Sequence, residues 1–328
     1  MHQILSTLLF SLIFTLLAGS GSRLTQDAGV SLERADAALR GGDYPAARKG
    51  YETLVAEGRN AEQARVGLLR TLNETGAYRE ASKLAETFVS RNPSPELFLE
   101  AGLIARAIGD LRRAETYLRR SHEQPGPAGI HAAGELAELM NSQGKRSEAR
   151  VLWEGIMQQY RSGRLRGSEA LGQAAVAAWR LGYAQDAKDI FLDATDENAS
   201  GPVSARPLAD FGFLFLDKYN STDAMDVFRD CLKINGRYPP ALLGMARTRL
   251  FDSSPEAETQ ARAAISVNPN YVPAINLLAE LRMQEEDYAA AEREVRRALA
   301  IDPANLESLS LLAACQQSTG DLAGYAAT

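Results

Sequence analysis

Reactive side chains are scarce in this sequence, and their scarcity excludes most kinds of active site. The 328 residues include two cysteines and three histidines. There is no Gly-x-x-x-x-Gly-Lys phosphate loop, no Gly-x-Ser-x-Gly nucleophile turn and no paired-cysteine metal motif. His122 and His131 are nine residues apart, which is not the one-turn spacing that places two metal ligands on one helix face. We therefore expect no enzymatic activity, no bound metal and no cofactor.

A surplus of positive charge is also lacking. The net charge is −6 and the isoelectric point is near 5.4. Because proteins that bind nucleic acid usually carry a basic surface, nucleic acid is not an expected partner. Hydrophobic residues make up 45% and charged residues 24% of the chain, which is typical of a soluble protein. Aromatic residues are few, and alanine and leucine are abundant, which favours helices.

Long apolar runs are missing after the first twenty residues, which differ from the rest of the chain. Residues 8–17 are almost entirely apolar, and no charged side chain precedes Arg23. This run is shorter than the roughly 20 residues that a membrane-spanning helix needs. It is followed by Ala18-Gly19-Ser20, small residues of the kind that signal peptidase recognises.

This pattern predicts a signal peptide over residues 1–20 and a short linker over residues 21–27. The protein is then expected to be exported, to the periplasm or as a secreted protein. One feature departs from the usual signal peptide, because no lysine or arginine comes before the apolar run. An uncleaved membrane anchor therefore remains an alternative, and only in that case do we expect contact with a membrane.

A turn signal followed three residues later by alanine recurs along the rest of the chain. Gly42-Asp43-Tyr44 before Ala47 is a clear example. The recurring alanines are Ala47, Ala81, Ala114, Ala149, Ala187, Ala224, Ala257 and Ala291. Successive alanines are separated by 34, 33, 35, 38, 37, 33 and 34 residues. A large side chain lies four positions after the alanine in six of the eight units, and several units close with Asn-Pro or Asp-Pro.

With this period and these signals, the sequence resembles the tetratricopeptide-repeat family over about residues 28–325. The resemblance implies an all-α, right-handed superhelical solenoid, with about eight helix-turn-helix repeats over residues 28–303. Residues 304–328 are expected to form a capping helix or the start of a ninth repeat. Cys231 and Cys315 fall about three repeats apart, too far for a disulfide, so we expect two buried free thiols.

In this family the first helix of each repeat lines a concave groove, and that register implies a set of partner-binding residues. Those residues are Arg70, Leu99, Leu103, Arg106, Trp179, Arg180, Phe213, Arg249, Asn276 and Glu280. The middle of this surface is apolar and aromatic, which suits a peptide with a hydrophobic anchor. Alternatively, Trp179 and Phe213 pack against neighbouring helices. The Lys, Asn and Arg residues of the family's two-carboxylate clamp are not found.

The resulting functional hypothesis is a non-catalytic scaffold that acts outside the cytoplasm and binds a partner protein or peptide in its groove. Two alternatives remain open. The chain could be the repeat module of a larger secreted or envelope protein, such as a peptidase or a component of export machinery, that presents substrate to a following domain. It could also self-associate through the unfinished ninth repeat.

Overall fold

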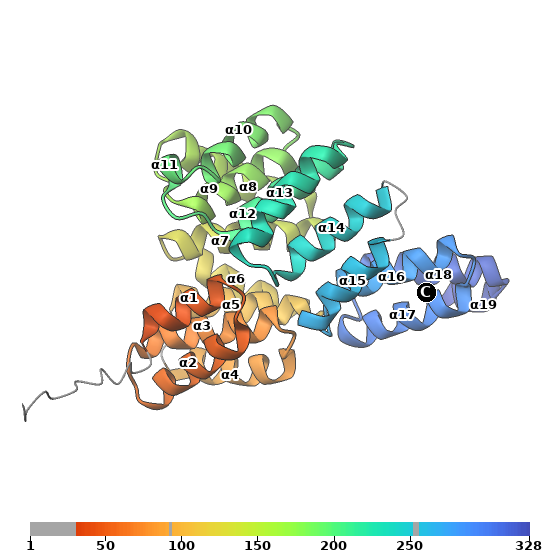
Figure 1. Cartoon of the computed structure of the whole chain (residues 1–328), viewed down its shortest axis with the longest axis horizontal. Coiled ribbons are helices and arrows are strands. Elements are labelled where there is room, and N and C mark those ends of the chain that lie inside the picture. Colours follow the sequence, from red (N-terminus) through yellow and green to blue (C-terminus); the bar gives the residue numbers. More distant parts are fainter. Residues whose placement is uncertain (1–30, 92–93, 252–255) are drawn as a thin grey trace, which may run out of the picture.

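The fold was described from a computed structural model, which places residues 31–91, 94–251 and 256–328. The predicted signal peptide and linker lie outside the described residues. Within these ranges the chain consists of helices joined by turns, and no strand is present (Figure 1). The all-α prediction is therefore confirmed for the part of the chain that is described.

Nineteen helices follow one another in the described ranges. They are α1 (Leu32–Arg40), α2 (Tyr44–Ala56), α3 (Ala61–Glu74), α4 (Tyr78–Arg91), α5 (Pro95–Ala107), α6 (Leu111–His122), α7 (Pro127–Ser142), α8 (Arg146–Arg161), α9 (Ser168–Arg180), α10 (Ala184–Ala194), α11 (Glu197–Ser200), α12 (Ala205–Asp217), α13 (Ser221–Ile234), α14 (Pro239–Phe251), α15 (Glu256–Val267), α16 (Val272–Gln284), α17 (Tyr288–Ile301), α18 (Leu306–Thr319) and α19 (Leu322–Ala327).

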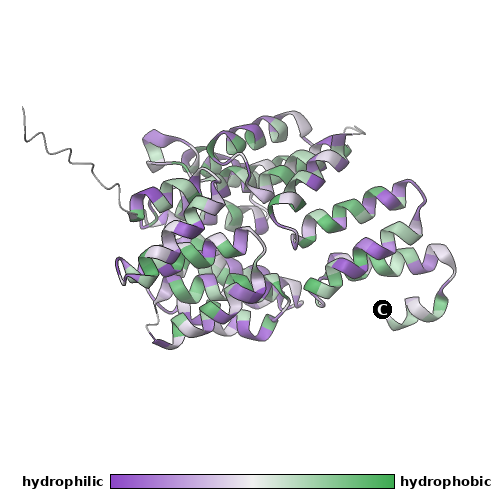
Figure 2. Ribbon diagram, turned by 60° about the horizontal axis from the view of Figure 1, so that its bottom comes forward, coloured by the Kyte–Doolittle hydropathy of each residue, from purple (hydrophilic) through white to green (hydrophobic). Residues whose placement is uncertain are grey.

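The helices pack in consecutive antiparallel pairs, and neighbouring pairs stack to form a solenoid. Each helix packs mainly against the next helix and the next but one, with the four-residue α11 inserted between the fifth and sixth pairs. The last pair consists of α18, which packs against α17, and the short α19. Hydrophobic positions gather on the sides where helices meet, and polar positions face outward (Figure 2). This arrangement is the predicted repeat solenoid.

The recurring alanines are buried in the helix packing. All eight are buried, with at most 1% of their surface exposed. The large residues four positions later are buried beside small residues on neighbouring first helices. A Cβ on Gly102 would overlap the Leu118 side chain, and a Cβ on Gly67 would overlap the Tyr51 ring. The repeat motif therefore encodes a pairing of a large side chain with a small residue, which holds helix axes close together.

The turns within the repeats combine a left-handed residue with a helix N-cap. Gly42 has a φ of 78°, and Asp43 accepts a hydrogen bond from the Ala46 backbone N–H of α2. Glycine adopts this backbone conformation without steric cost, and an aspartate at the N-cap satisfies a free helix N–H. In the eighth repeat, Glu286 occupies the left-handed position with a φ of 60°.

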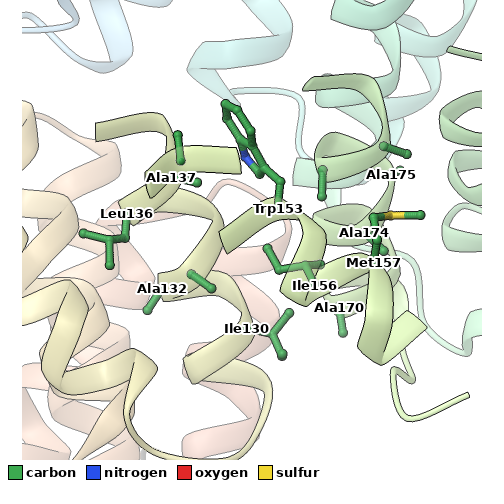
Figure 3. Close-up of a cluster of buried hydrophobic side chains, with 14 of the residues drawn as sticks. Ile130, Ala132, Leu136, Ala137, Trp153, Ile156, Met157, Ala170, Ala174 and Ala175 are labelled. Atoms are coloured by element: carbon green, nitrogen blue, oxygen red, sulfur yellow. The ribbon is translucent and has the colours of Figure 1, made fainter. Parts of the chain in front are cut away.

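The middle repeats contain a continuous hydrophobic core across three helices. Leu136 on α7, Trp153 and Ile156 on α8, and Ala174 on α9 pack together there (Figure 3). The longer spacing between these repeats is taken up by the 16-residue helices α7 and α8 and by α11.

None of the described helices combines the length and the hydropathy needed to cross a membrane. Both cysteines are buried and carry free thiols.

Candidate functional site

The superhelix closes on itself, so that loops of the last repeats touch turns of the first repeats. Asn235, in the loop between α13 and α14, donates a hydrogen bond of 3.1 Å from Nδ2 to the Tyr44 hydroxyl. Asn268, in the loop between α15 and α16, donates a hydrogen bond of 3.0 Å to the Tyr78 hydroxyl. These pairs are separated by 191 and 190 residues in sequence. Helix α15 accordingly lies near the first repeats, and α16 and α17 extend away from them (Figure 1).

A chamber of about 850 Å³, partly open to solvent, lies beside these contacts. One wall comes from α3, α5 and α7, and the facing wall comes from the loops that precede α14, α16 and α18. Its apolar and aromatic lining consists of Tyr78, Leu103, Ala107, Leu111, Leu139, Tyr238, Pro239, Pro240, Tyr271, Val272, Pro273, Ala304, Leu306 and Leu309. Its charged lining consists of Glu74, Arg106, Glu135, Glu138, Arg206, Asp302 and Glu307.

Arginines on the inner face are held by buried carboxylates from the next repeat. Arg70 on α3 donates from Nε and Nη2 to Glu100 Oε1 on α5, at 2.9 and 2.8 Å. The Arg70 side chain is 45% exposed, whereas that of Glu100 is 1% exposed. Arg106 on α5 lies 2.6 Å from Glu135 on α7 in the same way. Each carboxylate therefore fixes the position of an arginine from the preceding repeat.

Glu135 is the centre of this charge network. Its carboxylate also lies 3.4 Å from His131 Nε2 and 3.5 Å from Arg206 Nη1 on α12. Burial alone would raise the pKa of Glu135, but Arg106, His131 and Arg206 together hold it well below its usual range. The carboxylate therefore stays ionised and ties α5, α7 and α12 together across the inner face.

Two other interior carboxylates have the opposite electrostatic environment. Burial raises the pKa of Glu74 to about 7, and Arg70 and Arg206 offset this only in part. Burial likewise raises the pKa of Asp210, on α12, to about 7. Both side chains therefore change charge near neutral pH, and a cation brought close to either one would favour its ionised form.

The predicted site residues from the second and third repeats lie on or behind this inner face. Leu103 and Arg106 line the chamber. Arg70 lies on the same face and is joined to Glu100. Leu99 is 3% exposed and packs in the central hydrophobic core, so its side chain faces other helices.

The predicted residues of the fifth and sixth repeats form a separate cluster. Trp179 Nε1 donates a hydrogen bond of 3.0 Å to Asp217 on α12. The Arg180 guanidinium lies 4.4 Å from the centre of the Trp179 ring and donates to Glu138 at 2.6 Å. Phe213 packs edge-on against Phe228 at 5.1 Å, within the core of the sixth repeat. The half-buried Trp179 thus connects α9 to α12, and Phe213 mainly supports packing.

The predicted residues of the seventh and eighth repeats are engaged in contacts within the chain. Asn276 is fully buried, and its side chain hydrogen-bonds Asn305, Glu307 and Ser308 at the start of α18. Arg249 lies 3.2 Å from Glu256.

Glu280 lies 3.8 Å from Arg247, and burial raises its pKa. Of the ten predicted residues, only Leu103 and Arg106 are therefore brought together in the chamber.

Several chamber residues were not predicted from the sequence. Arg206 is the second residue of α12, and the helix register that gave Phe213 would also have given Arg206. Tyr238 and Tyr271 each lie three residues after the loop asparagines Asn235 and Asn268, a repetition that could have been noticed. Nothing in the sequence indicated that these loops would face α3 and α5.

The comparisons with known proteins agree with this architecture. A sequence profile of the tetratricopeptide repeat matches residues 272–305, which contain α16 and α17. The chain has the tetratricopeptide-repeat fold. No curated protein is similar enough in sequence to count as a relative.

Two solved structures show a similar fold at low sequence identity. One chain of the APC/C hetero-tetramer Cut9-Hcn1 matches with a TM-score of 0.51 and 14% identity over 86% of the present chain. The present chain spans about half of that protein, 54% of its length. The human IFIT1 dimer with PPP-AAAA matches with a TM-score of 0.52 and 15% identity, over 80% of the present chain and 69% of the IFIT1 chain. At these identities the likeness concerns the fold alone.

Proposed function

We propose that this protein is a non-catalytic scaffold that binds an extended polypeptide segment inside its superhelix. The tetratricopeptide-repeat fold is a protein-interaction scaffold, because stacked helix pairs create a long inner surface. The observation that carries the proposal is the chamber, which combines apolar walls with fixed polar groups. A largely preformed hollow of this kind is typical of binding sites.

The charges of the chamber favour a segment with basic side chains. Five carboxylates line the chamber, from Glu74, Glu135, Glu138, Asp302 and Glu307, against the two guanidinium groups of Arg106 and Arg206. Both arginines lie beside carboxylates of the chain itself. Glu138 and Glu307 are likewise paired, with Arg180 and Arg247. Within the described part of the chain Glu74 and Asp302 are not ion-paired, so these two carboxylates supply the negative charge that attracts a lysine or arginine side chain.

The walls of the chamber supply the complementary apolar contacts. Tyr238 and Tyr271 together with Pro239 form flat, rigid surfaces on the side of the C-terminal loops. Such surfaces bind aliphatic stems of basic side chains as well as apolar residues. We propose a partner segment that alternates apolar and basic residues.

The proposed place of action is outside the cytoplasm. This rests on the sequence of residues 1–20, whose apolar run and small residues resemble a signal peptide. Expression of the full chain with a C-terminal tag, followed by cell fractionation and mass measurement of the tagged protein, tests this point. Loss of residues 1–20 and recovery outside the cytoplasm support it, and an intact cytoplasmic chain contradicts it.

A peptide-display selection tests the binding proposal. Random 12-residue peptides are selected on the folded chain and on two variants, Ala107→Trp and Ala56→Trp. Ala107 is the last residue of α5 and lines the chamber, whereas Ala56 is the last residue of α2 and is exposed elsewhere. The first substitution fills the chamber, and the second controls for the added indole.

The proposal expects enriched peptides that carry lysine or arginine beside apolar residues. Their binding should be lost in Ala107→Trp and kept in Ala56→Trp. Enrichment of acidic peptides would contradict the proposed basic partner, and binding that Ala107→Trp leaves intact would show that the chamber is not the binding site.

A further inference from the structure

One position of the repeat points outward along the whole solenoid. It follows the buried alanine of each second helix by two residues, which is about 200° further round the helix. In the eight repeats this position holds Lys49, Lys83, Thr116, Val151, Asp189, Asp226, Thr259 and Arg293, and all eight residues are exposed. The alanine side of the helix packs inward, so this position is the outermost point of each repeat.

The charge at this position changes in one direction along the first six repeats. It is positive in the first and second repeats, neutral in the third and fourth, and negative in the fifth and sixth. A second exposed charge of the same sign lies one helical turn before two of these residues, Arg79 before Lys83 on α4 and Asp186 before Asp189 on α10. Within the described ranges none of these four side chains forms an ion pair.

The second helices of the first five repeats lie side by side and form one outer ridge. Ion pairs join each of the first four helices to the next, Arg48 to Glu80, Arg113 to Glu86, and Arg119 to Glu148. Helix α10 lies close to α8, because burial and three aspartates of α10 raise the pKa of Tyr160 on α8. The outer ridge therefore consists of α2, α4, α6, α8 and α10, and α4 and α10 carry unpaired charges of opposite sign.

This charge order is complementary to itself. A twofold axis that runs parallel to the helices, between α6 and α8, places α4 of one copy opposite α10 of another copy and α6 opposite α8. Equivalent positions of the repeat lie at the same height along each helix. Lys83 therefore faces Asp189 of the other copy, and Thr116 faces Val151 of the other copy. By symmetry each of these pairings occurs twice.

We propose that two copies of this chain associate through their outer ridges, with α4 and α6 of one copy against α10 and α8 of the other. The charged pairs flank an apolar centre, where Val151 is 67% exposed. A single exposed valine is ordinary on a protein surface, but here opposite charges on its two sides orient a second copy over it. Two outer ridges touch over a few helices only, so the contact belongs to the weak class of interfaces, which bury less than about 1,200 Å².

The proposed dimer leaves the chamber free. The chamber is bounded by α3, α5 and α7 and by the loops before α14, α16 and α18, none of which belongs to the outer ridge. A dimer would thus present two chambers at once, and two linked sites bind a repetitive partner more tightly than one. The association itself does not depend on what the chamber binds, and it uses a surface separate from the C-terminal helices α18 and α19.

Sedimentation equilibrium at several protein concentrations tests the association. In low salt the average mass of the wild-type chain should rise with concentration from that of a monomer toward that of a dimer. High salt should shift the equilibrium back to the monomer, because the flanking charges are exposed and are screened. A wild-type chain that stays monomeric at every concentration in low salt would overturn the proposal.

Two charge-reversal variants test the pairing of the two halves. They are Arg79→Glu/Lys83→Glu, which makes both halves negative, and Asp186→Lys/Asp189→Lys, which makes both halves positive. Each variant alone should dimerise at least about tenfold more weakly than the wild type, because attraction becomes repulsion on both flanks. An equimolar mixture should dimerise again, because every negative half then meets a positive one. Restored association also shows that both variants are folded.

The matched control is Arg262→Glu/Arg293→Glu. Both arginines are exposed on α15 and α17, outside the outer ridge, and their replacement changes the net charge as much as the α4 variant does. The control should dimerise like the wild type. Equal association of the wild type and both reversal variants, or a mixture that stays monomeric, would overturn the proposal.

Flotation with phosphatidylglycerol vesicles distinguishes a second copy from an anionic lipid surface as the occupant of the basic half. A chain that stays monomeric but floats with the vesicles, and loses this binding in Arg79→Glu/Lys83→Glu, would assign that half to lipid and overturn the dimer. The peptide-display result bears on the chamber alone, so failure of the dimer and failure of the proposed function are distinguishable.

Discussion

The turn glycines of the first repeats and those of the middle repeats share a backbone conformation but differ in their surroundings. Gly76 in the second repeat and Gly144 in the fourth repeat both have a φ of 75°. An added Cβ would overlap Asn268 at Gly76 but would meet no atom within 4 Å at Gly144. The same sequence signal therefore has one role in the middle repeats and two in the first repeats.

This comparison distinguishes the backbone conformation that a repeat requires from the close contact that the closed superhelix requires. Each described turn within a repeat contains a residue with positive φ, whichever repeat it belongs to. The first three turns additionally require the absence of a side chain, because loops from distant repeats approach them. Substitutions at matched positions can therefore measure the two requirements independently.

The largest effect is expected when alanine replaces the turn glycines. Gly76→Ala should lower the free energy of unfolding by about 2–4 kcal/mol, since backbone strain adds to the overlap with Asn268. Gly144→Ala should cost only the strain, about 1 kcal/mol. Urea unfolding followed by circular dichroism measures both. Equal losses at the two sites would mean that the loop does not rest on Gly76.

A smaller effect is expected from Glu74, which ends α3 close to the contact between Gly76 and Asn268. Its pKa is raised to about 7 in the folded chain, whereas an unfolded glutamate has a pKa of about 4.3. Because the folded state binds the proton more tightly, stability should rise as the pH falls from 8 to 5. The raised pKa of Asp210 also makes the stability rise as the pH falls through this range.

The lowered pKa values of Glu135 and Glu169 have the opposite effect on stability. They make the chain lose stability as the pH falls below about 4.

Glu74→Gln removes one part of this dependence. The gain in stability between pH 8 and pH 5 should shrink by about 1 kcal/mol, a value reduced for water in the chamber. Thermal unfolding of both chains at pH 5, 6, 7 and 8 provides the measurement. A pH profile that Glu74→Gln leaves unchanged would indicate that this carboxyl is well solvated.

The hydroxyls of Tyr44 and Tyr78 accept hydrogen bonds from Asn235 and Asn268, and each should contribute about as much as one hydrogen bond. Tyr78→Phe leaves the Asn268 amide nitrogen with only its longer hydrogen bond of 3.4 Å to the Asn73 carbonyl oxygen, and it should cost about 1 kcal/mol of stability. Tyr288 occupies the same place in the eighth repeat and is half-buried. Tyr288→Phe should change the stability by less than about 0.5 kcal/mol. Similar values for the two variants would contradict a special role of the Tyr78 hydroxyl.

The smallest effect concerns a turn that lacks glycine. Glu286 is exposed and has a φ of 60° in the eighth repeat. Glu286→Gly should stabilise the chain by about 0.5 kcal/mol, because relief of strain exceeds the added entropy of the unfolded state. Thermal unfolding checks the sign. A loss of stability would show that the glutamate side chain makes a stabilising contact that outweighs the strain.

Most of the fold was predictable from the sequence because it is determined by local signals. The period of the buried alanines gave the helix pairs, and the turn signals gave the positions where helices reverse. The small residue Gly102 packs against Leu118 of the paired helix, where an added Cβ would overlap the leucine side chain. These features depend on residues within one or two repeats, so periodicity reveals them.

The closure and the chamber were not predictable in the same way. The contact of Asn268 with Gly76 depends on the small rotation between successive repeats, which adds up over the solenoid and is not written in any single motif. The prediction of partner-binding residues also depended on the exact helix register, and a shift of one position changes which residues face the groove. Arg106 lies in the chamber, whereas Leu99, seven residues earlier on the same helix, is buried in the core. A register taken from a family therefore gives the inner face only approximately.

The central claim is that the superhelix is closed, and one distance measures this directly. Spin labels on Arg79→Cys in α4 and Ser266→Cys in α15 report the separation across the Gly76 and Asn268 contact, and both positions are exposed. Double electron-electron resonance on the otherwise wild-type chain should give one narrow distribution at the distance of the closed superhelix. A broad distribution centred at much longer distances would show that the ends of the solenoid do not meet, and would contradict the account.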